Sequence, residues 1–231
     1  MDRSVGLAPP GNPGDGFLGS LSAPQQEDLM GRGRRQRYRR GASLFVEGAS
    51  SQRVFLLLSG RVKIWLLTED GREVVLAMRA PGDLLGELSF LDGHPHSASA
   101  STVEPAEALV IAASDFRAFL EAQPAVAMKM LELLSRRLRD SDEKRTEFAA
   151  FDTVGRVARR LVELADRFGD AGEAGIRITL PMTQEELAGW TGASREAVSK
   201  ALGTLRSLGW IETHRREITV LNPEGLRKRS R

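Results

Sequence analysis

Residues 183–206 constrain the fold more than any other segment, because two helix starts and one tight turn can be identified in them. The segment reads TQEELAGWTGASREAVSKALGTLR. Thr183 and Glu186 make a T-x-x-E capping box, which predicts a helix that begins there. Gly192 falls where a tight turn needs a residue that tolerates positive φ, and Ser194 is a favourable N-cap for a second helix. We therefore expect two short helices joined by a turn.

The second expected helix has a polar face at its N-terminal end, while its apolar residues recur at helical spacing and would pack on the first helix. Arginine can donate to guanine O6 and N7, glutamate can accept from cytosine N4, and lysine adds a guanine or phosphate contact. The amide end of this helix and its capping hydroxyl suit a phosphate. We therefore expect the helix to enter the major groove of double-stranded DNA. The candidate DNA-binding residues are Thr183, Ser194, Arg195, Glu196, Ser199 and Lys200.

Two short strands are predicted after the helix pair. The sequence GWIETHRREITVLNP contains the apolar runs WIET and ITVL on either side of HRRE. This pattern indicates a β-hairpin with Arg215 and Arg216 at its tip, where they would contact DNA phosphates. Residues 152–231 are therefore expected to form a winged helix-turn-helix domain. An ordinary helical hairpin with surface charges is the alternative.

A long helix is predicted over residues 124–151. Its residues fall on a seam with alternating spacings of four and three, which is a heptad pattern. The pattern favours a coiled coil with a second copy of the chain, but a helix packed only on its own domain would share it. Polar seam positions often control register or hold a ligand between subunits. The seam residues are Ala127, Leu131, Leu134, Leu138, Ser141, Arg145 and Phe148.

Residues 35–111 have the pattern of an antiparallel β-roll. Apolar runs such as VFLLLSG, RVKIWLL and REVVLAM alternate with the turn sequences TEDG and APGD, and two more strands are expected around Pro105. The Gly- and Pro-rich start of the chain, residues 1–20, is expected to be a disordered arm. A helical region is expected to begin at Ser114, with Ser114 or Asp115 as a possible N-cap.

The expected fold class is therefore α+β. It consists of the disordered arm at 1–20, a β-roll sensor domain at 21–123, a dimerisation helix at 124–151 and the winged helix-turn-helix at 152–231.

Composition excludes several other classes of protein. The 231 residues include no cysteine, so disulfide frameworks, thiol catalysis and Cys-ligated iron–sulfur or zinc sites are excluded. No apolar run reaches the roughly 18 residues of a membrane span, and no secretory signal is visible, so a cytoplasmic protein without membrane contact is expected. Several basic residues gather near the C-terminus, either as a phosphate-facing surface or as a solvated tail. They are Arg227, Lys228, Arg229 and Arg231.

With these motifs established, the chain resembles the CRP/FNR family over about residues 22–226. The most specific matches are GDLLGELSFLDG (82–93) and TQEELAGWTGASREAVSKAL (183–202). The resemblance implies a cyclic-nucleotide-binding β-roll, a dimerisation helix and a winged helix-turn-helix. It also implies a transcription regulator that binds a two-fold symmetric operator with half-sites similar to TGTGA and meets RNA polymerase. Cyclic AMP or another cyclic nucleotide would be its effector, and no cofactor is required for folding.

The resemblance assigns ligand-binding roles to several residues. Gly86, Glu87 and Leu88 match the family's phosphate-binding cassette, in which glycine lets backbone amides approach a phosphate and glutamate accepts from a ribose hydroxyl. The family then places an arginine and a small hydroxyl residue, where this chain has His96 and Ser97. Histidine departs from that pattern, because it is largely neutral above its pKa of about 6.5. The base would be contacted from the dimerisation helix by Ser141 and Asp142, with Arg137 one turn earlier.

The DNA-reading residues also match the family, since Arg195, Glu196 and Lys200 stand where it has Arg, Glu and Arg. Three alternatives stay open. The protein could bind DNA without any effector, as an architectural protein or a regulator with a vestigial pocket. The H-x-H at 94–96 could begin a metal site of a β-roll enzyme, although the sequence has only three histidines. The same histidines could hold a haem. We expect no enzyme and no metal.

Overall fold

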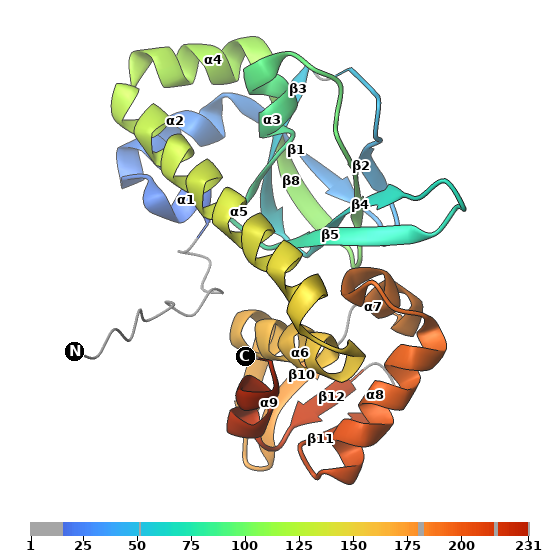
Figure 1. The fold of residues 1–231 in the computed structure, drawn as a ribbon. Coiled ribbons are helices and arrows are strands. Elements are labelled where there is room, and N and C mark those ends of the chain that lie inside the picture. The colour runs from blue at the N-terminus through green and yellow to red at the C-terminus, as the bar shows by residue number, and fades with distance from the viewer. Residues whose placement is uncertain (1–15, 51, 180–182, 215–216, 231) are drawn as a thin grey trace, which may run out of the picture.

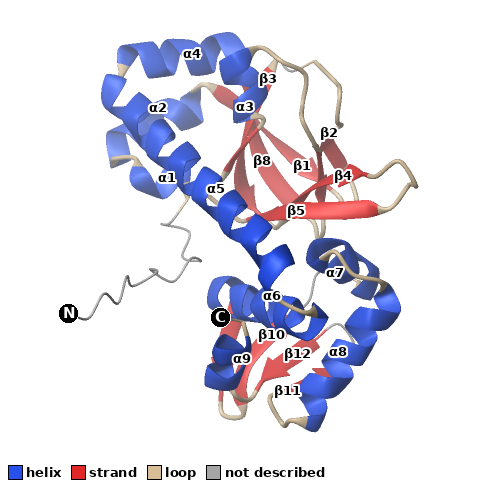
Figure 2. Cartoon of the chain, viewed as in Figure 1, coloured by secondary structure: helices blue, strands red, loops and turns tan. Residues whose placement is uncertain are grey.

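One long helix, α5 (Pro124–Ala150), runs from a β-rich N-terminal part of the chain to a smaller C-terminal part (Figures 1 and 2). The structure is a computed structural model that describes residues 16–50, 52–179, 183–214 and 217–230. Proline at the first helical position of α5 has a fixed φ that suits a helix start. The single continuous helix expected from the heptad pattern is confirmed.

The N-terminal part contains two four-stranded sheets, with strand orders β1-β8-β3-β6 and β2-β7-β4-β5. Every pairing in them is antiparallel, as the sequence predicted. Strands β7 and β8 lie on either side of Pro105, also as expected. The strands are β1 (Gly33–Tyr38), β2 (Ser43–Phe45), β3 (Arg53–Ser59), β4 (Val62–Leu67), β5 (Glu73–Arg79), β6 (Leu84–Leu85), β7 (Ser99–Thr102) and β8 (Ala106–Ala112).

Strand β3 joins the two apolar cores of this part, because its successive side chains point to opposite faces. Phe55 and Leu57 pack between the sheets, together with Leu85 and Ala100. Val54 and Leu56 belong instead to the core under the helices. All four β3 side chains are at most 5% exposed, which explains why the strand is a continuous apolar run rather than an alternating one.

Short helices cover the outer face of the first sheet (Figure 1). They are α1 (Phe17–Ser20), α2 (Ala23–Gly31), α3 (Glu87–Asp92) and α4 (Ala113–Ala122). The expectation of a disordered arm at 1–20 is wrong for its last residues, because Phe17 is fully buried with its ring 6.3 Å from that of Phe116. Residues 1–15 lie outside the described residues. Helix α4 begins one residue before the expected cap, with Ala112 as its N-cap.

The C-terminal part packs helices on a small antiparallel sheet of order β11-β12-β10-β9. Asp152 caps the first helix by accepting from the amide of Gly155 at 2.8 Å. Two elements were not expected: the glycine-rich segment forms β9, and the basic tail forms α9. The elements are α6 (Thr153–Phe168), β9 (Gly169–Gly172), β10 (Gly175–Thr179), α7 (Gln184–Thr191), α8 (Arg195–Ser207), β11 (Ile211–His214), β12 (Glu217–Val220) and α9 (Pro223–Arg229).

The basic residues of α9 make internal contacts. Arg227 is 2.7 Å from a carboxylate oxygen of Asp166, and Arg229 pairs with Asp152. These two arginines therefore fasten α9 to α6 and its cap.

Replacement of Phe17 by alanine tests whether α1 is part of the fold. We expect Phe17→Ala to lower the free energy of unfolding by about 3–5 kcal/mol, because it leaves a cavity in a well-packed core. Urea denaturation followed by circular dichroism measures the change. Leu67→Ala is the control, since Leu67 is 56% exposed. A Phe17→Ala loss no larger than that of Leu67→Ala would show that α1 does not pack as described.

Candidate nucleic-acid interface and ligand pocket

Both caps of the helix pair α7–α8 form as the sequence predicted. The Thr183 hydroxyl accepts from the amide of Glu186 at 3.1 Å, and the Glu186 carboxylate accepts from the amide of Thr183 at 2.7 Å. Ser194 accepts from the amide of Ala197 at 3.2 Å. Gly192 ends α7 with φ +59° and ψ +41°, the left-handed conformation for which glycine is favoured. The short turn between the helices is therefore set by local sequence.

The two sides of α8 differ sharply in exposure. Its apolar residues are buried against α6 and α7. The expected DNA-facing residues are all exposed at the helix start, namely Ser194, Arg195, Glu196, Ser199 and Lys200. Hydrogen bonds from its own amide and from Ser194 lower the pKa of Glu196, so this carboxylate is an ionised acceptor at neutral pH. The helix start therefore presents fixed donors and acceptors to solvent.

The wing lies beside the C-terminal end of α8. Strands β11 and β12 pair from Ile211 with Val220 to His214 with Glu217. The Arg206 side chain of α8 donates to the Thr213 hydroxyl at 3.1 Å, a contact that sequence reasoning missed. Arg215 and Arg216, the expected basic tip, lie outside the described residues.

A pocket opens between β5, β6, α3 and α5. It is lined by Phe45, Ile64, Arg79, Leu84, Leu85, Gly86, Glu87, Leu88, Ser89, His96, Ser97, Ala98 and Arg137. Six of the expected ligand residues are thus together. Arg137 pairs with Glu87 and donates to the Leu84 carbonyl at 2.8 Å. Gly86 has φ +77°, and a Cβ there would lie 3.4 Å from Cε1 of His96, so a larger residue would crowd the pocket.

The side chain of His96 is held firmly in this pocket. Its ring stacks on Phe45, with centroids 3.9 Å apart and an interplanar angle of 16°. Its Nδ1 lies 3.1 Å from the Ser89 hydroxyl, and the residue is only 6% exposed. Burial lowers the pKa of His96, and the nearby Glu87 carboxylate only partly opposes this effect. The ring is therefore neutral at physiological pH.

The remaining expected ligand residues lie outside the pocket lining. Ser141 and Asp142 are exposed on α5, beyond Arg137, and Asp142 lies 3.6 Å from Arg145. Conversely, the pocket includes Arg79, which sequence reasoning missed because it ends an otherwise apolar strand. The charged residue that directly follows the apolar run VVLAM was the signal that could have identified Arg79.

The heptad seam of α5 faces away from the chain's own cores. Met130 and other residues on the opposite side of α5 are buried under the N-terminal helices. Leu131, Leu138 and Phe148 of the seam are 56%, 63% and 52% exposed, and Met128 beside them is 58% exposed. An apolar stripe of this kind along one helix is unusual for a surface that meets only water.

The helix-turn-helix rests on the β4–β5 hairpin of the N-terminal part. Lys63 of β4 donates to Glu73 of β5 at 2.7 Å and to Glu186 of α7 at 2.8 Å. Burial alone would raise the pKa of Glu186, but hydrogen bonds from Lys63 and Thr183 outweigh it and lower that pKa. Gly189 of α7 approaches the backbone of Glu73 so closely that a Cβ would collide with its carbonyl oxygen. The two parts therefore meet through an ion-pair cluster and a close backbone approach.

The described part of the chain offers neither a metal-ligand cluster nor a membrane span. It contains no group of three or more His, Cys, Asp or Glu side chains suited to hold a metal. Within the same residues, no helix combines the length and apolar character needed to cross a bilayer.

Comparisons with known proteins place both halves of the chain. Residues 35–123 match the cyclic nucleotide-binding domain family, and residues 155–229 match the Crp-like helix-turn-helix domain family. The chain is 36% identical over 192 residues to a CRP-like cAMP-activated global transcriptional regulator of Mycobacterium tuberculosis, covering 83% of this chain and 86% of the relative. It is 34% identical to the cyclic AMP receptor protein of Thermus thermophilus, covering 82% and 85%. The structure of FixK2 from Bradyrhizobium japonicum has the same fold, with a TM-score of 0.77, 24% identity and coverage of 85% and 96%.

The turn between α7 and α8 yields a test of how the DNA-binding part is seated. A Cβ on Gly192 would collide with the ring of Phe148 at the end of α5. We expect Gly192→Ala to cost about 1–2 kcal/mol of stability for its left-handed φ, and about 1–3 kcal/mol more for overpacking. The second cost should vanish in a Phe148→Ala background, which a double-mutant cycle on urea unfolding would measure.

Gly71→Ala is the matched control, because Gly71 has φ +78° and no atom lies within 4 Å of the position that an added Cβ would take. It should show only the cost of the backbone conformation. A coupling energy near zero between positions 148 and 192 would contradict the described contact.

Proposed function

The chain belongs to the CRP/FNR family of transcription regulators, so it is a DNA-binding regulator and not an enzyme. We propose that it binds a two-fold symmetric operator as a homodimer and that a cyclic nucleotide controls this binding. The observation that carries the proposal is the exposed row of polar side chains at the start of α8, in a helix-turn-helix whose first helix, α7, contacts the pocket-bearing β-roll. Cytoplasmic localisation and contact with RNA polymerase belong to the same proposal.

The start of α8 is suited to DNA in charge and in geometry. The exposed amide end of a helix favours phosphate, and Ser194 stands there as its cap. Arg195 offers a bidentate fork for guanine, whereas the ionised Glu196 accepts from cytosine. Lys200 lies about one and a half turns further along α8 and supplies a point charge. A wing beside the helix would add backbone contacts, which fix the register of the protein on the duplex.

The exposed seam of α5 supports a homodimer. Two copies of the apolar stripe around Leu131 and Leu138 would cover each other in a parallel coiled coil. The opposite face of α5 is already occupied by the chain's own core, so a second copy would pack on the face that this core leaves exposed. Two-fold symmetry would then place two α8 helices on successive major grooves.

A series of charged groups runs from the pocket to the DNA-binding part and supports ligand control. Arg137, which contacts Glu87 in the pocket, lies 3.9 Å from Asp83, and Asp83 lies 3.8 Å from Arg167 of α6. Along α6, Arg167 and Arg160 share Glu163, at 3.6 Å and 2.7 Å. Any ligand that re-pairs Arg137 or Glu87 therefore changes the partners that hold α6.

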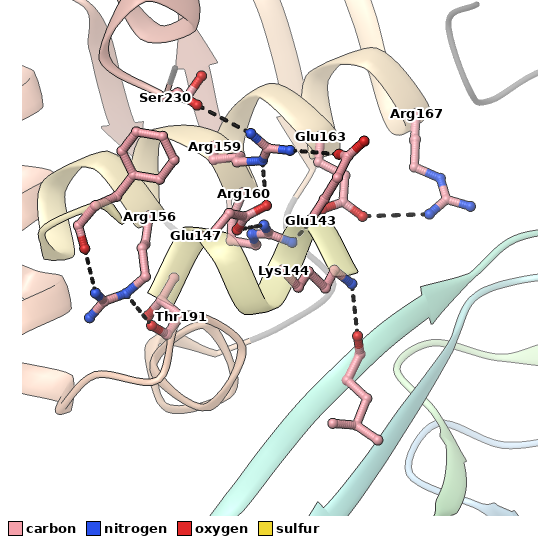
Figure 3. Close-up of polar contacts among 12 residues, drawn as sticks. Glu143, Lys144, Glu147, Arg156, Arg159, Arg160, Glu163, Arg167, Thr191 and Ser230 are labelled. Carbon is pink, nitrogen blue, oxygen red and sulfur yellow. Dashed lines mark hydrogen bonds and ion pairs between the residues drawn. The ribbon is translucent and has the colours of Figure 1, made fainter. Parts of the chain in front are cut away.

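The series returns to α5 close to its C-terminal end (Figure 3). Arg160 is 2% exposed and pairs with Glu147, which is 5% exposed. Arg159 binds Glu143 at 2.9 Å, and Lys144 donates to the Leu76 carbonyl of β5 at 2.8 Å. These contacts define one orientation of α6 on α5. A ligand that binds a second orientation more tightly would shift the population toward it.

The pocket fits a phosphate-bearing ligand. Gly86 leaves its backbone accessible, and guanidinium groups of Arg79 and Arg137 reach the lining. Glu87 and Ser97 are placed to contact hydroxyl groups, as the resemblance to cyclic-nucleotide domains implies. Ser141 and Asp142 would reach a base only if it extends toward α5, so their contribution remains a proposal.

DNA binding tests the proposal directly. We expect the full-length protein to bind a fluorescent duplex with two TGTGA-type half-sites tightly in the presence of cyclic AMP, cyclic GMP or cyclic di-GMP, and weakly without it. Arg195→Met should weaken binding by about 1–3 kcal/mol, since it removes a bidentate base contact. Fluorescence anisotropy at fixed salt measures both effects.

Arg72→Met is the control, because Arg72 pairs with Asp70 at the exposed tip of the β4–β5 hairpin. Equal affinity with and without every nucleotide would favour an effector-independent regulator. Equal affinity for a scrambled duplex would remove sequence-specific binding from the proposal.

The oligomeric state tests the seam. We expect the wild type to sediment as a dimer and Leu138→Glu to sediment as a monomer. Two carboxylates would otherwise be buried in the seam, and each unpaired buried charge costs several kcal/mol. Leu67→Glu, on the exposed side of β4, should remain dimeric. A dimeric Leu138→Glu protein would show that α5 does not form the interface.

A further inference from the structure

The floor of the pocket carries more positive than negative charge. Arg79, Arg137 and Glu87 line it, and the charges of Arg167 and Asp83, which are outside the lining, also act on Arg79. Both carboxylates already have partners: Glu87 pairs with Arg137, and Asp83 lies within 4 Å of both Arg137 and Arg167. Both carboxylates near Arg79 are therefore already partnered by the other two arginines.

Arg79 is the arginine left over. Within the described part of the chain it makes no hydrogen bond and no ion pair within 4 Å, although it ends β5 and lines the pocket. Burial, with the neighbouring Arg137, lowers the pKa of Arg79 to about 10, so the group is still a cation at neutral pH. A half-buried cation without a partner is costly, and proteins keep such a group chiefly where an anion completes it.

The other side of the pocket lacks the charge that an anion would need. His96 occupies the position where the resemblance implies an arginine, and its ring is neutral and locked between Phe45 and Ser89. Arg137 is committed to Glu87 and to the Leu84 carbonyl. Of the residues that line the pocket in the described structure, Arg79 alone offers an uncommitted guanidinium.

We propose that Arg79 is the phosphate-binding residue of this pocket and takes the role that an arginine at position 96 would have. The proposal rests on the proposed function, since it concerns the effector that controls operator binding. The ligand class is a phosphate diester or monoester, with a cyclic nucleotide as the expected source. Binding of its anion would supply the missing counter-charge and reduce the repulsion between Arg79 and the guanidinium groups of Arg137 and Arg167. Arg137 is the first residue of the charged series that leads to α6.

Calorimetric titration of the full-length protein tests this assignment. The probes are cyclic AMP, cyclic GMP, cyclic di-GMP and inorganic phosphate, which distinguish a nucleotide from a free anion. We expect Arg79→Met to weaken binding of the nucleotide that the wild type binds by about tenfold to a hundredfold, as loss of a charge-assisted contact should. Arg79→Lys should lie between, because it keeps the charge without the bidentate fork. Arg72→Met should bind as the wild type does.

A second pair of measurements separates ligand binding from a structural role. The double variant Arg79→Met, His96→Arg should bind the nucleotide more tightly than Arg79→Met does, because it places a guanidinium on the other wall of the pocket. Without ligand, Arg79→Met should unfold at the wild-type temperature or above it, since an unpartnered buried cation is removed. A structural arginine would instead show a lower unfolding temperature and no rescue.

The outcomes distinguish this inference from the proposed function. If the wild type binds a nucleotide and Arg79→Met binds it equally well, the role of Arg79 is overturned while effector control stands. If the wild type binds none of the probes, both the role of Arg79 and nucleotide control are overturned, and operator binding by the same preparation would keep the DNA-binding assignment. If Arg79→Met does not fold, Arg79→Lys and the His96→Arg single variant decide the matter: unchanged affinity in both overturns the inference.

Discussion

The buried ion pair between Arg160 and Glu147 determines where the DNA-binding part sits. Both side chains are almost fully excluded from water, and each has a second partner, because Arg159 also pairs with Glu147 and Glu163 also pairs with Arg160. The pair joins α6 to the last turns of α5, and Asp152 starts α6 only two residues after α5 ends. The position of α7 and α8 follows, because both pack on α6. The orientation of the exposed start of α8 therefore depends in part on an ion pair that lies on α5 and α6.

That arrangement is held by specific polar contacts together with a shared apolar core, in which Val75, Met78 and Val103 of the N-terminal part are clustered with residues of α6, α7 and α8. Lys63 and Glu186 connect the hairpin to α7, and the Gly189 backbone rests on Glu73. The energy of a buried charge cluster depends strongly on its geometry. A small change in one charged partner therefore alters which orientation of the two parts is more stable. Control of one part by the other fits a molecule whose parts meet in this way.

Local signals in the sequence predicted the local structure well. The caps at Thr183, Ser194 and Asp152 and the turn at Gly192 are encoded within a few residues, so the helix-turn-helix could be placed without coordinates. Strand β9 and helix α9 were missed because glycines and a basic tail carry weak local preferences. Phe17 was missed because the few apolar residues of this Gly- and Pro-rich stretch show no helical or strand period. Contacts such as Lys63 with Glu186 join residues 123 positions apart, and no local pattern encodes them.

Helix α5 serves several structures at once. Its buried side closes the core of the β-roll, its exposed seam is free for a second chain, Arg137 reaches the pocket, and Glu147 holds α6. A change on this helix therefore disturbs more than one of these structures. The side chains of Arg79 and His96 line the pocket, and in the described residues neither makes an ion pair with α5 or α6. Over evolutionary time, ligand preference in a chain of this design is free to drift at those two positions, while the helix that transmits the signal stays fixed.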